Sequence, residues 1–143
     1  MISRTLLIAT RPFGASLGAE RVAAAIGAGL TDGGWEADPM PIEDSDELAA
    51  ARGLAQTPGF DARMRAARAV VIAEPRLHED TLAGTVAFEL ATRARQAGVP
   101  TYAVTRENLL NSFDVRILDL QTILEAKTHR SLRSAGRELA GLV

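Results

Sequence analysis

The sequence predicts a single doubly wound α/β domain, in which helices cover both faces of a parallel β-sheet. Three short, largely apolar runs carry this prediction, at residues 5–9, 69–73 and 99–104. Continuous apolar runs of this length are typical of parallel strands that are buried on both faces. Segments with helical periodicity separate the runs, so strand and helix alternate along the chain. The 143 residues are enough for one domain with a sizeable core.

The composition excludes several classes of function. A net charge of -2 gives no reason to expect nucleic acid or an anionic membrane as a partner. The chain has no cysteine and only two histidines, so we expect neither thiol chemistry nor a metal site. It also has no apolar run of 18 residues, and it opens directly into a strand instead of a signal peptide, so we expect a cytoplasmic protein.

The spacing of apolar residues and the positions of turn-forming residues predict the remaining strands and helices. The expected strands span residues 5–9, 35–41, 69–73, 99–104 and 115–118. The expected helices begin at Leu17, Asp46, Phe60, Asp80 or Thr81, and Gln121. Pro39 and Pro41 favour an edge position for the second strand, and we interpret the acidic run 43–47 after it as a solvated connection. The alternation of elements predicts a flavodoxin-like strand order, 2-1-3-4-5.

The polar loop 74–80 follows the third strand and carries most of the ionisable side chains around it. It lies at the carboxyl end of its strand, which is where open α/β sheets bind their ligands. Arg11 follows the first strand, so we expect it to lie beside Arg76 and His78 at the same edge of the sheet. Two guanidinium groups in this position suit a carboxylate or a phosphate.

Two helix N-termini face the same edge and favour negative charge there. We therefore predict an anion-binding site formed by Arg11, Ser16, Arg76 and Thr81. One alternative stays open at this point, in which the loop arginines are solvated or paired with Glu74, Glu79, Asp80 or the acidic segment 43–47.

Three motifs in order resemble the glycerate kinase family. Residues 59–84, GFDARMRAARAVVIAEPRLHEDTLAG, are similar to the family's segment of helix, strand, acidic loop and helix start, and residues 8–19 and 41–47 resemble two earlier motifs. The chain is identified on these motifs as a shortened member of that family. The resemblance implies ATP-dependent phosphorylation of glycerate, with ATP and Mg²⁺ as cofactors if the activity is retained. The candidate catalytic residues that it implies are Glu74, Arg76 and His78.

The chain departs from the family in ways that change the expected function. Residues 48–57 fill the place of the family's large second domain, so residues 1–143 form a single glycerate-kinase-like domain. Gly14 and Thr85 stand where the family has lysines, and Ser45-Asp46 replaces a double glycine. We therefore expect the isolated chain to be inactive as a kinase. Two alternatives stay open, a small-anion-binding or protein-docking module and one half of a split kinase. The expected partners are a small anionic ligand and either a second copy in a homodimer or another protein.

Overall fold

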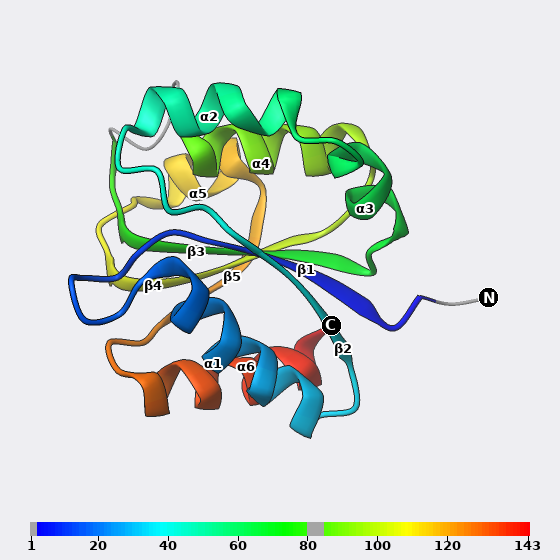
Figure 1. Ribbon diagram of the computed structural model, residues 1–143, viewed down its shortest axis with the longest axis vertical. Coiled ribbons are helices and arrows are strands. Elements are labelled where there is room, and N and C mark those ends of the chain that lie inside the picture. The colour runs from blue at the N-terminus through cyan, green and yellow to red at the C-terminus, as the bar shows by residue number, and fades with distance from the viewer. Residues whose placement is uncertain (1–2, 80–84) are drawn as a thin grey trace.

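A five-stranded parallel sheet forms the middle of three layers in the computed structural model, which describes residues 3–79 and 85–143 (Figure 1). The strands lie in the order β2-β1-β3-β4-β5, and every neighbouring pair is parallel. Their bounds are Thr5–Thr10 (β1), Glu36–Pro41 (β2), Ala69–Leu77 (β3), Thr101–Asn108 (β4) and Leu120–Glu125 (β5). The predicted fold class, the strand order and the edge position of the proline-containing strand are confirmed.

The helices form the two outer layers. Their bounds are Ala19–Asp32 (α1), Glu47–Gln56 (α2), Phe60–Ala66 (α3), Val86–Gln96 (α4), Ser112–Leu118 (α5) and His129–Leu142 (α6). Helices α1 and α6 cover one face of the sheet, and α2 to α5 cover the other (Figure 1). Among the described residues, none of these helices is long and apolar enough to cross a membrane.

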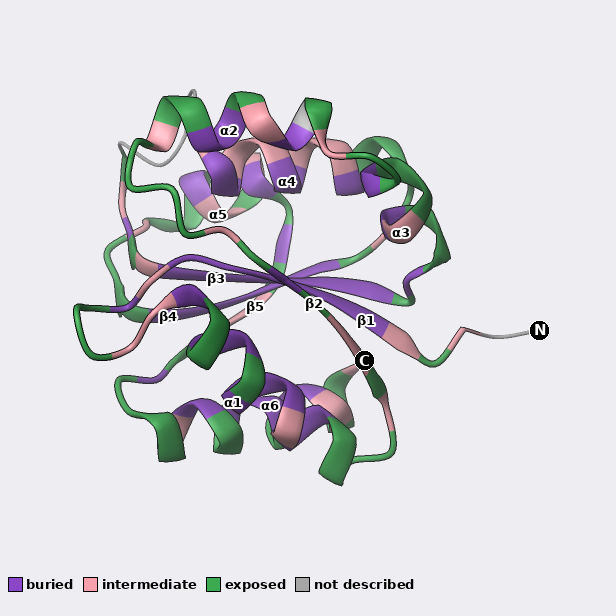
Figure 2. Cartoon of the chain, viewed as in Figure 1, coloured by how far each residue is buried: buried purple, intermediate pink, exposed green. Residues whose placement is uncertain are grey.

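The central strands are buried on both faces because successive side chains point to opposite sides of a strand. On β1, Leu7 packs under α2 to α5 while Leu6 and Ile8 pack against α1 and α6. On β3, Val70 and Val71 are divided between the two faces in the same way. Buried residues accordingly fill the sheet and the inward sides of the helices (Figure 2).

Glycines allow α1 and α6 to pack with their backbones in close contact. A Cβ atom added to Gly136 would overlap the carbonyl oxygen of Ile26, and one added to Gly29 would overlap the carbonyl oxygen of Arg133. Side chains at either position would therefore force the two helices apart.

The last third of the chain differs from the prediction. Residues 115–118, predicted as a strand, belong to α5, and the helix predicted from Gln121 is β5 followed by α6. Asn111 caps α5 through its side chain, and Asp119 ends the helix in the left-handed region, with φ of 54°. A short apolar run such as 115–118 does not distinguish a strand from a helix. The polar residues at its two ends, Asn111 and Asp119, favour the helix.

Several element ends also differ from the prediction. Strand β3 continues to Leu77, so residues 74–77 are strand and not loop. Asp46 instead of Ser45 caps α2, and Gly18 instead of Ser16 lies at the start of α1. Thr85 caps α4, whereas the expected caps Asp80 and Thr81 lie outside the described residues.

Candidate functional site

The carboxyl ends of β1 and β3 lie side by side, but the chain leaves them in opposite directions. After β1 it enters α1 on one face of the sheet, and after β3 it reaches α4 on the other face (Figure 1). Such a switch point leaves a crevice between the loops and is where open α/β sheets bind ligands. The loops after β1, β3 and β4 therefore delimit the candidate site.

A buried arginine lies at this edge. Arg11 is only 6% exposed, and its Nη1 donates to the carbonyl oxygen of Ile42 at 3.0 Å. Its Nη2 donates to Oε2 of Glu47 at 3.0 Å. The other carboxylate oxygen of Glu47 accepts from the backbone N–H of Val86 at 2.8 Å. Glu47 thereby connects the end of β1, the first turn of α2 and the N-terminus of α4.

Glu74 completes this group, which we call the edge cluster (Arg11, Glu47 and Glu74). Burial and, to a lesser extent, the nearby Glu47 carboxylate together raise the pKa of the Glu74 carboxyl to about 8, although the Arg11 guanidinium opposes them. Glu74 is therefore mostly protonated at neutral pH. Its Oε1 is buried and has no hydrogen-bond partner in the described part of the chain.

A second group of polar residues lines a cavity of about 350 Å³ between the loops after β3 and β4, which we call the loop cavity. Its lining comprises Arg76, His78, Glu79, Leu109, Asn111 and Asp114. Arg76 pairs with Glu107 at 3.5 Å but stays largely exposed. Leu109, which lines the cavity, is 51% exposed, and Phe113 of α5, the chain neighbour of the lining residue Asp114, is 68% exposed.

An anionic oxygen already occupies the N-terminus of α1. Oε1 of Glu43 accepts from the backbone N–H of Glu20 at 3.1 Å and lies 3.4 Å from where a Cβ atom of Gly18 would be. A helix N-terminus favours negative charge because its first N–H groups have no partners within the helix. The Glu43 carboxylate is thus held by the backbone alone and remains exposed.

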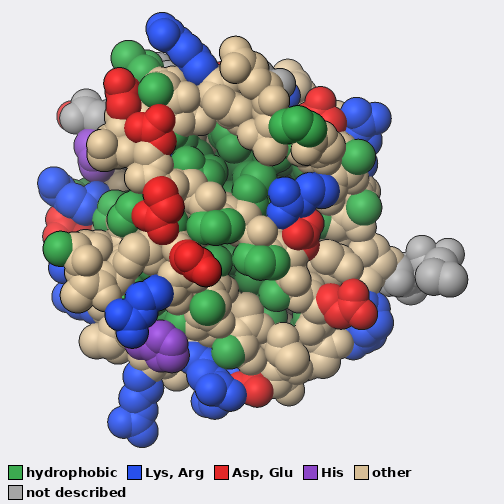
Figure 3. Space-filling model, in the orientation of Figure 1, with side chains coloured by type: hydrophobic (Ala, Val, Ile, Leu, Met, Phe, Trp, Pro, Cys, Tyr) green, Lys and Arg blue, Asp and Glu red, His purple; other side chains and the backbone are tan. Residues whose placement is uncertain are grey.

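Two arginines flank the same loop. Nη1 of Arg106 donates to the carbonyl oxygen of Phe13 at 2.6 Å, and Nη1 of Arg21 donates to that of Ser16 at 3.3 Å. Both residues are exposed. Charged side chains of both signs gather along this edge, on the left of the space-filling view (Figure 3). The α1 N-terminus is therefore an anion-favouring position, here filled by the chain's own carboxylate.

The structure separates the predicted site residues into two groups. Arg76 and His78 line the loop cavity together, but Arg11 is turned under α2 and does not line it. Ser16 is exposed in the loop before α1, and Thr81 lies outside the described residues. No group of three or more residues suited to holding a metal ion occurs within residues 3–79 and 85–143.

Three residues that shape the edge were not part of the predicted site. Glu43 and Glu47 belong to the acidic run that we interpreted as a solvated connection, although Glu47 is the partner of buried Arg11. This run directly follows the edge strand β2, and residues in that position lie beside the loop of the neighbouring strand, which was the available signal. Arg106 lies in β4, beyond residue 104, where we expected that strand to end.

Three solved structures resemble the chain along nearly its whole length. A diflavin flavoprotein A3 from Nostoc sp. aligns with a TM-score of 0.53 and 17% identity, covering 99% of this chain and 94% of that one. An oxidoreductase from Corynebacterium diphtheriae aligns with a TM-score of 0.55 and 13% identity, covering 99% and 97%. The flavodoxin-like domain of a Synechococcus sp. protein aligns with a TM-score of 0.53 and 17% identity, covering 96% of both chains. At these identities the likeness establishes the fold, which is a single flavodoxin-like α/β domain.

The identification as a glycerate kinase relative is wrong. The structures that resemble this chain are flavodoxin-like domains, and neither a protein-family model nor a curated protein matches it. The kinase and transferase functions implied by the resemblance, whether intact, degenerate or split, fall with it. The residues that carried the resemblance have other roles here, since Glu47 bridges Arg11 to α4 and Glu74 is buried. Residues 48–57 lie in α2 and its C-cap, and their origin as a remnant of a lost domain stays a prediction.

Proposed function

We propose that this chain is a flavodoxin-like electron carrier that binds flavin mononucleotide at the carboxyl edge of its sheet. The observation that carries the proposal is the anion-favouring N-terminus of α1, located at the switch point of the fold. The solved structures of similar fold add support, because they include a diflavin flavoprotein and an oxidoreductase.

The residues around α1 fit the phosphate of such a cofactor. The Glu43 carboxylate is a stand-in for it, since both are anions that accept from backbone N–H groups. Because Glu43 is exposed and, among the described residues, its carboxylate accepts one hydrogen bond, from the Glu20 N–H, a phosphate can displace it at small cost. Arg21 and Arg106 would then supply the positive charge that balances a phosphate.

The loop cavity fits the flavin ring. A flavin ring is flat and largely apolar with polar edges, so it needs an apolar platform and a few donors. Phe113 and Leu109 offer exposed apolar surface next to the cavity, and Arg76 provides guanidinium donors in its lining. When bound, the flavin supplies the capacity to accept and release one or two electrons. The chain's own residues bind it, orient it and limit its access to water.

A titration with two flavins tests this proposal. Flavin mononucleotide and riboflavin share the ring, but only the first carries a phosphate. We expect the apo-chain to quench flavin mononucleotide fluorescence at micromolar concentrations and to bind riboflavin more weakly. Glu43→Gln removes the competing charge, so it should tighten flavin mononucleotide binding by about threefold to tenfold and leave riboflavin unchanged.

The control is Glu36→Gln, which removes an exposed carboxylate at the amino end of β2, opposite the carboxyl edge of the sheet, and should change neither affinity. Phe113→Ala should weaken both flavins, because both use the ring platform. Equal binding of the two flavins, or no binding at millimolar concentration, would contradict the proposal. If the bound flavin has the same midpoint potential as free flavin, the proposed role as an electron carrier is contradicted.

Two predictions made from the sequence are kept as part of this proposal. One is a cytoplasmic location, which fractionation of cells that express a tagged chain will check. The other is a homodimer, for which light scattering at tens of micromolar should give twice the 15.2 kDa mass of the chain. A mass of one chain at that concentration would rule the dimer out.

A further inference from the structure

The two edges of the sheet differ in how they are protected. β2 carries Pro39 and Pro41, which have no N–H to donate and so discourage pairing with a further strand. β5, Leu120–Glu125, has no proline and pairs only with β4. Its residues are half-buried or exposed from Gln121 onward, so one row of its backbone donors and acceptors is accessible. The β5 edge can therefore accept an added strand.

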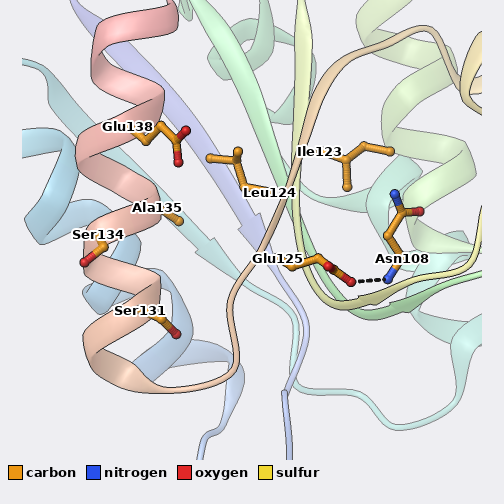
Figure 4. Close-up of a pocket in the computed structure, with 8 residues that line it drawn as sticks. All are labelled: Asn108, Ile123, Leu124, Glu125, Ser131, Ser134, Ala135 and Glu138. Carbon is orange, nitrogen blue, oxygen red and sulfur yellow. Dashed lines mark hydrogen bonds between the residues drawn. The ribbon is translucent and has the colours of Figure 1, made fainter.

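A cavity of about 360 Å³ lies between this edge strand and α6, and we call it the β5 groove (Figure 4). Its lining comprises Asn108, Ile123, Leu124, Glu125, Ser131, Ser134, Ala135 and Glu138. Apolar side chains form part of its wall, and the only charged members of the lining are the two carboxylates, Glu125 and Glu138.

The hydrogen bonds of the groove determine what it offers to a ligand. The hydroxyl of Ser131 donates to the carbonyl oxygen of Thr128, and that of Ser134 donates to the carbonyl oxygen of Arg130. The backbone N–H of Asn108 donates to Oε2 of Glu125, as the dashed line in Figure 4 marks. With the hydroxyl protons of both serines used inside α6, the charged groups of the lining are the carboxylates of Glu125 and Glu138, which favour a cation.

Glu138 strengthens this preference. Its carboxylate has no hydrogen-bond or ion-pair partner among the described residues, and it points from α6 toward the groove (Figure 4). A group that complements the groove must therefore be a cation with several donors, carried on an apolar stem that can lie along Leu124 and Ala135. Arginine and lysine side chains have this form.

We propose that the β5 edge binds an extended basic segment of a partner protein. The partner's backbone pairs with β5 as an additional strand, and one of its arginine or lysine side chains enters the β5 groove between Glu125 and Glu138. Recognition by strand addition takes its affinity from main-chain hydrogen bonds and its specificity from a pocket for alternate side chains. The groove lies at the carboxyl ends of β4 and β5, where Asn108 and Glu125 end these strands, but it shares no lining residue with the loop cavity.

Fluorescence anisotropy with short labelled peptides tests this proposal. The probe is the extended sequence TVRVT, blocked at both ends, and two variants carry citrulline in place of arginine or a methyl group on alternate backbone nitrogens. We expect the arginine peptide to bind, the citrulline peptide to bind about tenfold more weakly, and the N-methylated peptide to lose binding. Citrulline keeps the shape of arginine without its charge, and N-methylation removes the strand donors.

The matching protein variants are Glu125→Gln and Glu138→Gln, which should each weaken the arginine peptide severalfold without affecting the citrulline peptide. Glu36→Gln, on the opposite edge strand β2, is the control and should leave all affinities unchanged. Circular dichroism and thermal melting establish that the variants fold. The proposal is overturned if the N-methylated peptide binds as well as the parent, if Glu138→Gln has no effect, or if no peptide binds at millimolar concentration. A chain that self-associates through β5 and excludes the peptide would overturn it as well.

Discussion

The two faces of the sheet are covered by helices that pack in different ways. On one face, α1 and α6 meet through the backbones at Gly29 and Gly136, and ion pairs from Asp32 to Arg133 and Arg137 lie at the surface. On the other face, α2 and α4 meet over the edge cluster, in which Arg11 and Glu74 are buried and Glu47 is partly exposed. The same sheet thus supports one tightly packed apolar layer and one layer with an internal polar group.

The difference follows from what each layer has to satisfy. Backbones in direct contact leave no room for adaptation, so the α1–α6 layer is fixed by shape. The α2–α4 layer contains a buried guanidinium and a protonated carboxyl, whose stability depends on partners and on pH. We infer that mutations should be most costly in the first layer and that pH effects near neutrality should come from the second. The following predictions test this comparison.

Gly136→Ala should produce the largest loss of stability. The added Cβ would overlap the carbonyl oxygen of Ile26 and approach the Cα of Gly29 to 3.0 Å, and neither backbone atom can yield locally. We expect a loss of about 3 kcal/mol in the free energy of unfolding, measured by urea denaturation. Gly141→Ala is the control on the same helix, because a Cβ atom there meets nothing within 4 Å. Equal effects at the two positions would show that the α1–α6 contact is looser than described.

This close contact illustrates which parts of the fold the sequence could predict. The apolar runs at β1 and β3 and the prolines of β2 fixed the strand order, since each reflects a local requirement of the chain. The role of Gly136 could not be found that way, because it depends on α1, more than a hundred residues earlier. The prediction also reversed strand and helix around Asp119, placing a strand at 115–118 and a helix from Gln121. The apolar run there is ambiguous, and a few polar residues outweigh it.

Glu47→Ala should produce the second-largest effect. Removing this carboxylate leaves the buried Arg11 guanidinium with the Ile42 carbonyl alone and leaves the Val86 N–H without its acceptor. We expect a loss of about 2 kcal/mol, below the range for fully buried pairs because the Glu47 side chain is 38% exposed. Glu89→Gln on α4 breaks only a pair with Arg93 at 3.4 Å and should cost less than about 0.5 kcal/mol. A Glu47→Ala variant as stable as the control would mean that Arg11 finds another partner.

The candidate site was harder to predict than the fold, and Arg11 shows why. Its type and position suggested an exposed anion ligand, but the side chain turns under α2 to reach Glu47, 36 residues further along the chain. The direction of a side chain after the last residue of a strand depends on what lies above it. Arg76 and His78 were predicted together and do line one cavity, since they are near neighbours in one segment. Their role as ligands of an anion stays a prediction.

The change per pH unit expected from Glu74 is smaller than either of these losses, and its sign can be stated in advance. The folded pKa of about 8 lies above the ordinary value of 4.5, so between these limits the folded chain keeps a proton that the unfolded chain has lost. This contribution to stability is complete below about pH 4.5 and disappears as the pH rises through 8. The exposed Asp32 acts in the opposite direction and in another range, because hydrogen bonds from Arg133 and Arg137 lower its pKa, so its contribution is lost only as the solution becomes strongly acidic.

Glu74→Gln isolates this contribution, because glutamine keeps the shape and the neutral form of the protonated carboxyl. Relative to this variant, the unmodified chain should lose about 1 kcal/mol of unfolding free energy for each pH unit between 6 and 7.5, close to the limit of roughly 1.4 kcal/mol for one proton. Urea denaturation at several pH values measures the difference, and Glu36→Gln should show the same pH dependence as the unmodified chain. In a Glu74→Gln background, the loss caused by Glu47→Ala should no longer vary over this pH range. Parallel curves for the unmodified chain and Glu74→Gln would mean that Glu74 is ionised at neutral pH, and the contrast between the two faces would then rest on packing alone.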